Sequence, residues 1–341
     1  MSAEIIKQLA ILIVGFALLV KGADLFVDGA SGIAKKFGIS ELIIGLTIVA
    51  MGTSAPEAAV SIAAAAKGSA GISIGNVIGS NIMNIFIILG VVASITPLKI
   101  ERSTVRYEMP FTIIVTVLFV LMGRDGLITR PDGAILWAGL LLYLAYLLRQ
   151  AKQKPAESPA QSETTVQKAE ETASAETVTE TAEANGTSAA TEESPSIWKL
   201  IALTIVGLAV ILVSSDYAVD AAVALAKIFN ISDRVIGLTI VALGTSLPEL
   251  VTSVTAALRG NADLAVGNVV GTCIFNLLFV LGTSALILPI PCAPKFLSDA
   301  YVAVGATVLL LLFGFTQMKI ARWEGVLLVA CYVAYAYVAL V

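Results

Sequence analysis

The chain of 341 residues contains no histidine and only three cysteines, which are scattered at positions 273, 292 and 331. Without histidine, an imidazole metal site, a histidine proton relay or a histidine-based catalytic dyad is excluded. Three isolated cysteines without a C-x-x-C spacing indicate neither a disulfide framework nor a zinc site. No nucleophile–base pair is visible, so we expect no enzymatic activity, no resident cofactor and no nucleic-acid partner.

Charged residues are also scarce, at 13% of the chain against 57% hydrophobic residues, and the mean hydropathy is +0.92. Soluble domains carry about 25% charged residues. The apolar residues come in blocks of about 20, the length of helix that spans the hydrocarbon core of a bilayer. Alternating ten-residue strands, which mark a membrane barrel, are absent. The composition therefore predicts an all-α polytopic membrane protein embedded in the lipid bilayer.

The apolar segments form two sets of five, separated by an acidic stretch. The first repeat, 1–150, holds about 5–30, 41–66, 72–95, 107–123 and 133–149; the second, 198–341, holds about 198–226, 233–258, 264–287, 299–316 and 322–340. Residues 151–197 carry nine Glu and three Lys and almost no large apolar residue. Such a segment cannot bury enough surface to fold, so we expect a disordered linker.

The two sets of five are related by an internal repeat at an offset of 192 residues. GLTIVAMGTSAPE at 45–57 recurs as GLTIVALGTSLPE at 237–249, with 11 of 13 positions identical, and GNVIGSNIMN at 75–84 recurs as GNVVGTCIFN at 267–276. Because five is odd, the second set must enter the membrane from the opposite side. The sequence thus predicts ten transmembrane helices in two inverted five-helix repeats, an arrangement that places a transport site near the midplane.

The charges of the predicted loops indicate the orientation. With the N-terminus outside, the inside loops collect 13 basic residues and the outside loops 7, with Lys21 left within a span. Because cytoplasmic loops are enriched in Lys and Arg, we expect a plasma (inner) membrane protein with both termini outside and the linker 151–197 in the cytoplasm.

The repeated motifs, within regions 45–90 and 237–282, place one glutamate each, Glu57 and Glu249, beside a proline in an apolar run. Pro56 and Pro248 are predicted to open their helices near residues 50–52 and 242–244, which frees backbone carbonyls that are tolerated at membrane depth only where they line a cavity. Neutral side-chain oxygens accompany each glutamate: Thr53, Ser54, Ser80 and Asn84 in the first repeat, and Thr245, Ser246, Thr272 and Asn276 in the second.

Carboxylates, hydroxyls, amides and carbonyls form an all-oxygen ligand set, which suits hard cations such as Ca²⁺ and Na⁺. Two carboxylates balance one Ca²⁺ or two Na⁺. Other roles remain open for these residues. The hydroxyls can bond to carbonyls of their own helices, and the asparagines can form interhelical hydrogen bonds. The repeated acids Asp24, Asp28, Asp216 and Asp220 are best explained by local ion pairs or a place at the entrance.

The paired GTSxPE and GN(V/I)xGSxxxN motifs resemble the two repeats of the cation/calcium exchanger (CaCA) superfamily, and most closely its prokaryotic sodium/calcium exchangers. The resemblance implies that Glu57 and Glu249 are central calcium ligands that also contact sodium. It implies the following further roles: Thr53 and Thr245 as ligands through backbone oxygen; Ser54, Ser246, Ser80, Thr272 and the carbonyls of Ala50 and Ala242 at flanking sodium sites; and Asn84 and Asn276 near the centre.

The resemblance also shapes the expected transport reaction. Some relatives have an aspartate where this chain has Asn276, which argues against the potassium-dependent branch, and the second motifs lack the acid that proton-coupled members tend to carry. We therefore expect a monomeric sodium/calcium antiporter that exports Ca²⁺ by alternating access, with the helices at 5–30 and 198–226 moving across the rest. A proton-coupled or other divalent-cation exchanger, a cation channel and a non-transporting scaffold are the alternatives.

Overall fold

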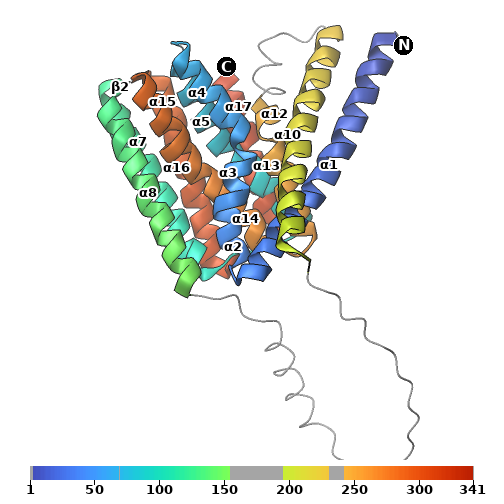
Figure 1. The fold of residues 1–341 in the computed structure, drawn as a ribbon. Coiled ribbons are helices and arrows are strands. Elements are labelled where there is room, and N and C mark those ends of the chain that lie inside the picture. The colour runs from blue at the N-terminus through green and yellow to red at the C-terminus, as the bar shows by residue number, and fades with distance from the viewer. Residues whose placement is uncertain (1–2, 69, 154–194, 230–241, 341) are drawn as a thin grey trace, which may run out of the picture.

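The structure is a computed structural model that describes residues 3–68, 70–153, 195–229 and 242–340 (Figure 1). Almost all of these residues are helical, and the helices stand side by side in one bundle. The predicted linker 151–197 lies mostly outside the described residues, because one helix ends at Gln153 and the next begins at Ile197. The start of the second glutamate motif, 237–241, also lies outside them.

The helices and short strands follow one another along the chain in two series. Before the linker they are α1 (Ala3–Phe37), α2 (Glu41–Ile44), η1 (Gly45–Val49), α3 (Ala50–Thr53), α4 (Ala55–Ala66), α5 (Ala70–Met83), η2 (Asn84–Leu89), α6 (Gly90–Ile95), β1 (Leu98–Lys99), η3 (Thr104–Glu108), α7 (Met109–Met122), η4 (Gly123–Asp125), β2 (Leu127–Ile128) and α8 (Arg130–Gln153). After it they are α10 (Ile197–Ile228), α12 (Ala242–Thr245), α13 (Leu247–Leu258), α14 (Ala262–Phe275), η6 (Asn276–Leu281), α15 (Gly282–Ile287), β3 (Ile290–Pro291), α16 (Pro294–Gln317), β4 (Lys319–Ile320) and α17 (Arg322–Leu340).

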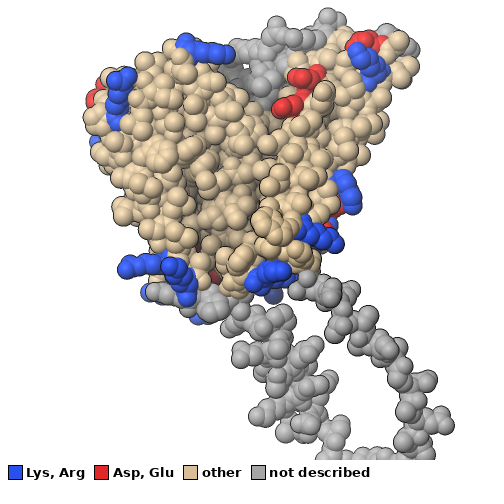
Figure 2. Space-filling view, in the orientation of Figure 1, with Lys and Arg blue, Asp and Glu red and all other residues tan. Residues whose placement is uncertain are grey.

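Several of these helices are long and apolar enough to cross a bilayer. Among the described residues there are seven such helices, or eight if the bent pair Glu41–Thr53 and Ala55–Ala66 is one span. Most Lys and Arg atoms in the visible face gather toward the two ends of the bundle, and the band between them is almost free of charge (Figure 2). The chain is therefore a multi-pass helical membrane protein, as predicted, whereas the count of ten helices stays a prediction.

The helix that carries Glu57 is interrupted just before the glutamate. α3 ends at Thr53, Ser54 is a turn residue, and α4 starts at Ala55 with an axis bent by 50°. The sequence predicted that this helix opens at residues 50–52, and that position is wrong, because the interruption lies at Ser54, two residues later. The Ser54 N–H closes the last turn of α3 on the Ala50 carbonyl at 3.1 Å, and Pro56 sits in the first turn of α4, where its missing N–H costs no hydrogen bond.

The second glutamate motif is interrupted in the same way. Ser246 separates α12 from α13, and Pro248 again lies in the first turn of the following helix. In this half too, the interruption falls beyond the predicted position at 242–244.

Wide helical turns mark both of the asparagine motifs. The π-helical turns η2 and η6 begin at Asn84 and Asn276, which are 192 residues apart. Single π-helical turns are rare and are frequently found at functional sites. The backbone is therefore irregular at both repeated motifs of each half of the chain.

Two short antiparallel strand pairs connect the two halves of the chain. β1 pairs with β4 and β2 with β3, so each pair joins a strand before the linker to one after it. The span Thr104–Asp125 separates β1 from β2 in the sequence, so the two pairs lie at opposite ends of the bundle. Neither half is therefore an independent unit, because each completes a sheet of the other.

Burial differs between the helices at the core of the bundle and those at its edge. The most apolar stretch of Ala262–Ile287 is 94% buried, whereas those of Ala3–Phe37 and Ile197–Leu225 are only 33% and 28% buried. α1 and α10, which hold these last two stretches, pack against each other at the edge of the bundle (Figure 1). Their contact is close, because a Cβ atom at Gly207 would overlap the backbone nitrogen of Phe26.

Close glycine contacts also bring the two glutamate-bearing halves together in the core. A Cβ atom at Gly267 of α14 would lie 2.7 Å from the Leu42 carbonyl oxygen, and one at Gly45 would lie 2.7 Å from the Leu264 carbonyl oxygen. Small residues at helix contacts in membranes allow this approach. α14 is thereby held directly against α2 and η1, the segment that leads to Glu57.

The packing of α1 on α10 predicts a destabilising substitution. We expect Gly207→Ala to lower the free energy of unfolding by about 1–3 kcal/mol, because the added methyl group must displace the backbone of the facing helix. Thermal unfolding of the detergent-solubilised protein measures the effect. Gly305→Ala in α16 is the control, because a Cβ atom there meets nothing within 4 Å. Equal unfolding temperatures for the two variants would contradict this packing.

Candidate cation site

Two glutamates lie in the core at the helix interruptions. The side chains of Glu57 and Glu249 are 1% and 0% exposed, and each is the third residue of its helix, α4 or α13. Neither forms an ion pair with a Lys or Arg among the described residues. The positive end of each helix dipole favours a nearby carboxylate, but removing a charge from water still costs several kcal/mol per ion. The pair therefore lacks a compensating positive charge from these residues.

Serines at the interruptions connect the two halves of this site. Ser54 donates to Glu249 Oε1 at 3.1 Å, and Ser246 donates to Glu57 Oε1 at 3.4 Å. Each glutamate is thus bound by the serine of the other half. The Ser54 hydroxyl also lies 3.1 Å from Thr272 Oγ1, which brings α14 into the same cluster.

Several buried polar atoms in this region have no hydrogen-bond partner among the described residues. They are Glu57 Oε2, Glu249 Oε2, Asn276 Oδ1 and both polar atoms of the Asn84 amide. In folded proteins the large majority of buried polar side-chain atoms are partnered, by protein or by water. The oxygens among these atoms, on two carboxylates and two amides, are of the kind that hard cations prefer.

The charge of this ligand set is limited to the two glutamates. No group of three or more Asp, Glu, His or Cys side chains that could hold a metal ion occurs in the described part of the chain. The remaining oxygens are neutral, as the sequence predicted. The set therefore matches one divalent or two monovalent cations in charge.

The other predicted ligands lie close to this cluster in the sequence but differ in their contacts. Thr53 is buried, and its hydroxyl bonds to the Val49 carbonyl at 3.1 Å and to Asn268 Oδ1 at 3.2 Å. Ser80 is buried on α5 one turn before Asn84. The role of the Thr53 backbone oxygen as a ligand stays a prediction.

The backbone ligands and Thr245 complete the predicted set. The Ala50 carbonyl accepts the Ser54 N–H at 3.1 Å and also lies 3.5 Å from the Thr53 hydroxyl. Thr245 is the last residue of α12 and is half-buried. Ala242 is the first residue of α12, and its side chain lies outside the described part of the structure. The structure thus places Ser54 in contact with Glu249 and Thr272, and Ser246 in contact with Glu57. Ser80, Asn84 and Asn276 lie on other elements, α5, η2 and η6.

Two asparagines, Asn76 and Asn268, use their amide NH₂ groups to bind the helices that carry the glutamates. Asn76 donates to the Glu57 carbonyl at 3.2 Å and to Ser61 Oγ at 2.9 Å. In the other half, Asn268 donates to the Glu249 carbonyl at 3.5 Å and to Ser253 Oγ at 3.0 Å. The roles of Ser61 and Ser253 were not predicted from the sequence, although both lie four residues after a glutamate, at the offset of the repeat.

A second contact that was not predicted concerns the carbonyl that a proline leaves unbonded. Pro248 cannot donate to the carbonyl of Gly244, four residues before it. Ser215 of α10 donates its hydroxyl to that carbonyl at 3.1 Å instead. Ala23 stands at the equivalent position of α1 and has no hydroxyl. The repeat could not reveal this contact, because the two halves differ there.

The hydrogen bonds of Asn268 predict the effect of removing its side chain on stability. Asn268→Ala removes the hydrogen bonds to the Ser253 hydroxyl and the Glu249 carbonyl and one of the contacts of the Thr53 hydroxyl, so we expect a loss of about 1–3 kcal/mol in the free energy of unfolding. Thr307→Val is the control, since this buried hydroxyl bonds only to Ala303 of its own helix. Thermal unfolding should rank Asn268→Ala well below Thr307→Val. The reverse ranking would show that the hydrogen bonds of Asn268 are dispensable.

The fold and these motifs are shared with known transporters. The family model of the sodium/calcium exchanger protein matches residues 7–151 and 199–341. The chain is 38% identical over 343 residues to the sodium/calcium exchanger MaX1 of Methanosarcina acetivorans, covering 95% of this chain and 96% of that protein. It is 39% identical over 286 residues to the inner membrane protein YrbG of Escherichia coli, covering 82% and 80%.

A solved structure agrees with this assignment. The structure of the sodium-calcium exchanger NCX_Mj soaked with zero Na⁺ and Ca²⁺ superimposes on this chain with a TM-score of 0.78 and 32% sequence identity. The superposition covers 99% of this chain and 100% of the NCX_Mj chain. Family, sequence and structure therefore agree that this chain belongs to the sodium/calcium exchanger family.

Proposed function

We propose that the protein is a sodium/calcium antiporter, which exchanges one Ca²⁺ for several Na⁺ at a site built on Glu57 and Glu249. The observation that supports this most is the pair of buried carboxylates, each with one oxygen unpartnered among the described residues. Membership of the sodium/calcium exchanger family, and the names of MaX1 and NCX_Mj, support the choice of ions.

The charge of the site accounts for the coupling between the two ions. A Ca²⁺ that leaves exposes two buried carboxylates to each other without a counter-charge, which is costly in a low-dielectric interior. Sodium ions that replace it remove that cost. Two Na⁺ balance the carboxylates, and any further Na⁺ must be held by neutral oxygens. Exchange is thus favoured over the release of either ion alone.

The neutral ligands divide between the centre and the flanks of this site in our proposal. Asn84 and Asn276 join the glutamates at the centre, together with the backbone oxygens of Thr53 and Thr245. The flanking sodium sites use Ser54, Ser246, Ser80, Thr272 and the carbonyls of Ala50 and Ala242. The cross-bonds from Ser54 to Glu249 and from Ser246 to Glu57 support this, because they link flanks to centre.

We further propose that residues 1–150 and 198–341 form two inverted repeats, with the termini outside an inner membrane and the segment 151–197 in the cytoplasm. The reciprocal serine–glutamate bonds support a two-fold relation between the halves. So does the strand pairing, since β1 and β3 are 192 residues apart, as are β2 and β4. The excess of basic residues in the loops assigned to the inside supports the orientation.

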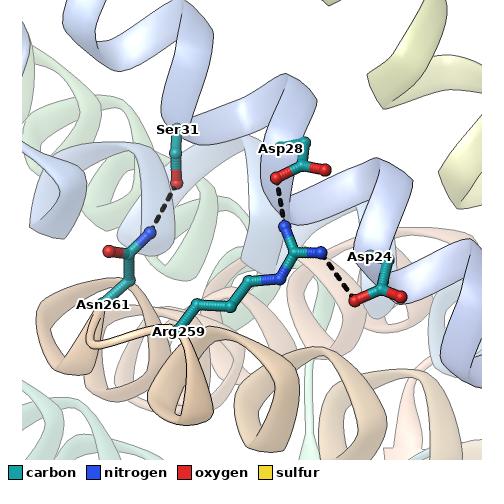
Figure 3. A network of polar contacts seen from close by, with 5 residues as sticks. All are labelled: Asp24, Asp28, Ser31, Arg259 and Asn261. Carbon is teal, nitrogen blue, oxygen red and sulfur yellow. Dashed lines mark hydrogen bonds and ion pairs between the residues drawn. The ribbon is translucent and has the colours of Figure 1, made fainter.

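Alternating access requires one part of the bundle to move, and α1 with α10 is the best candidate. This pair is among the least buried of the apolar spans and packs closely on itself. One polar cluster joins α1 to the end of α13 and the loop after it (Figure 3): Arg259 binds Asp24 at 2.7 Å and also binds Asp28, and Asn261 donates to Ser31 at 2.9 Å. We call this cluster the Arg259 latch.

The repeat places a second set of such charges at the equivalent position. Lys67, Asp216 and Asp220 correspond to Arg259, Asp24 and Asp28 at the offset of 192. All three are exposed, and they form no ion pair among the described residues. One of two equivalent latches is therefore closed and the other is open. In our proposal, movement of α1 and α10 opens the Arg259 latch and brings Lys67 toward Asp216 and Asp220.

The strength of the latch suits a reversible change. The Arg259 side chain is 33% exposed, and its partners Asp24 and Asp28 are 29% and 55% exposed. Ion pairs of this exposure contribute about 0–1 kcal/mol each, which biases two states without locking either of them.

The central roles of the glutamates predict the outcome of charge removal. Glu57→Gln and Glu249→Gln should each abolish sodium-dependent ⁴⁵Ca²⁺ flux in membrane vesicles, because one carboxylate cannot neutralise a divalent cation. Glu324→Gln is the control, since this buried carboxylate accepts the N–H of Ala321 at the start of α17, away from the site. Normal flux in both glutamate variants would refute the assignment of the site.

The second latch predicts a cross-link. In the double variant Lys67→Cys and Asp220→Cys, oxidation by copper phenanthroline during ion exchange should form a disulfide between the two new cysteines. This disulfide should block ⁴⁵Ca²⁺ flux, and its reduction should restore the flux. The Lys67→Cys and Asp220→Cys single variants serve as controls and should keep their flux under the oxidant. If both cysteines react with maleimide but no cross-link forms under any ion gradient, α10 does not approach Lys67.

A further inference from the structure

The centre of the site contains one position at which the two halves differ in kind. Asn84 and Asn276 are equivalent in the repeat, but Asn81, three residues before the first, corresponds to Cys273, three residues before the second. Both side chains are buried, at 2% and 1% exposure. An amide can donate and accept strong hydrogen bonds, whereas a thiol does both weakly. The two central asparagines therefore have different neighbours.

In one half, a chain of hydrogen bonds fixes the orientation of the central asparagine. Asn81 Nδ2 donates to the Cys273 carbonyl at 3.1 Å. Because a carbonyl can only accept, this contact determines which end of the Asn81 amide carries the oxygen. That oxygen, Oδ1, accepts from Asn276 Nδ2 at 3.1 Å. The amide of Asn276 is thereby oriented, and its own Oδ1 is the atom without a hydrogen-bond partner in the described structure.

In the other half, no such chain exists among the described residues. The Cys273 thiol lies beside Asn84, but neither polar atom of the Asn84 amide forms a hydrogen bond of ordinary geometry. The thiol instead faces the Asn81 carbonyl at 3.9 Å. Asn84 is 1% exposed, so both ends of its amide are buried without a partner from this part of the chain. No described contact fixes the orientation of the Asn84 amide.

We infer that Asn81 is a positioning residue that holds Asn276 as a permanent oxygen ligand, while Cys273 leaves Asn84 able to turn. This inference rests on the proposed cation site and assigns unequal roles within it. With a cation bound, Asn84 turns its oxygen toward the ion. When the ion leaves, the same amide turns its NH₂ group toward a glutamate and shares the negative charge. The asymmetry thus provides one fixed ligand for affinity and one adjustable ligand for the exchange of ions.

Exchanging the two residues tests this inference. Three variants are compared with the wild-type protein: Asn81→Cys, Cys273→Asn and the double exchange. The measurements are the KM for Ca²⁺ and the maximal rate of sodium-driven ⁴⁵Ca²⁺ flux, together with equilibrium ⁴⁵Ca²⁺ binding to the detergent-solubilised protein. Because Asn81 and Cys273 contact each other, the double exchange keeps the total side-chain volume of the pair.

The variants should separate affinity from rate. Asn81→Cys frees Asn276, so KM and the dissociation constant should rise by roughly three- to tenfold, the effect of one lost hydrogen bond, with a maximal rate near that of the wild type. Cys273→Asn fixes Asn84, so KM should fall and the maximal rate should fall with it. The double exchange restores one fixed and one adjustable asparagine, and both values should return toward the wild type.

Other outcomes would overturn the inference. A wild-type KM and dissociation constant in Asn81→Cys would show that Asn276 needs no support. Failure of the folded double variant to recover would show that the residues only fill space. If Asn81→Cys does not fold, Cys273→Asn keeps Asn81 intact and decides the matter through its maximal rate. Equilibrium ⁴⁵Ca²⁺ binding can be measured without transport. An absence of sodium-driven flux in the wild-type protein would therefore refute the proposed function, while the binding measurements would still test this inference.

Discussion

Two carboxylates buried without a positive partner among the described residues are the constraint on which the rest of this structure depends. Glu57 and Glu249 are almost completely shielded from solvent, and their cost in a membrane interior must be offset locally. The helix interruptions at Ser54 and Ser246 place each glutamate in the first turn of a helix. Ser54 and Ser246 bind these glutamates across the two halves of the chain, and Asn76 and Asn268 bind their carbonyls. In our proposal a cation supplies the missing counter-charge.

The structure also shows where the two halves of the chain depart from symmetry. The matched residues hold the ligands in place, whereas the unmatched ones distinguish the two sides. Ser215 reaches the Gly244 carbonyl, but Ala23 cannot make the equivalent bond. Arg259 is paired with two aspartates, whereas Lys67 forms no ion pair in the described part of the structure. A transporter with two fully equivalent halves would have no preferred state, so under the alternating access that we propose such differences would set the balance between the two conformations.

Much of this could be predicted from the sequence, because apolar runs and repeats reflect strong physical demands. The membrane class follows from hydrophobicity, and the repetition of GTSxPE singles out the two glutamates that the structure buries. The position of the helix break did not follow, because a proline is tolerated in the first turn of a helix and moves the break to Ser54. The hydrogen bonds from the amides of Asn76 and Asn268 to the glutamate carbonyls did not follow from the sequence either. Their role depends on which backbone groups face them, and that is a property of tertiary packing.

The central claim is that sodium alone drives calcium through this site. It is tested most directly by ⁴⁵Ca²⁺ uptake into vesicles that contain the wild-type protein, with Na⁺, K⁺ and H⁺ gradients imposed one at a time. We predict uptake against a concentration gradient with the Na⁺ gradient only, because the chain belongs to the sodium/calcium exchanger family and its GNVIGSN and GNVVGTC motifs lack an acidic residue. Uptake driven by a pH gradient with no response to sodium, or rapid flux that follows no counter-ion gradient, would contradict this claim.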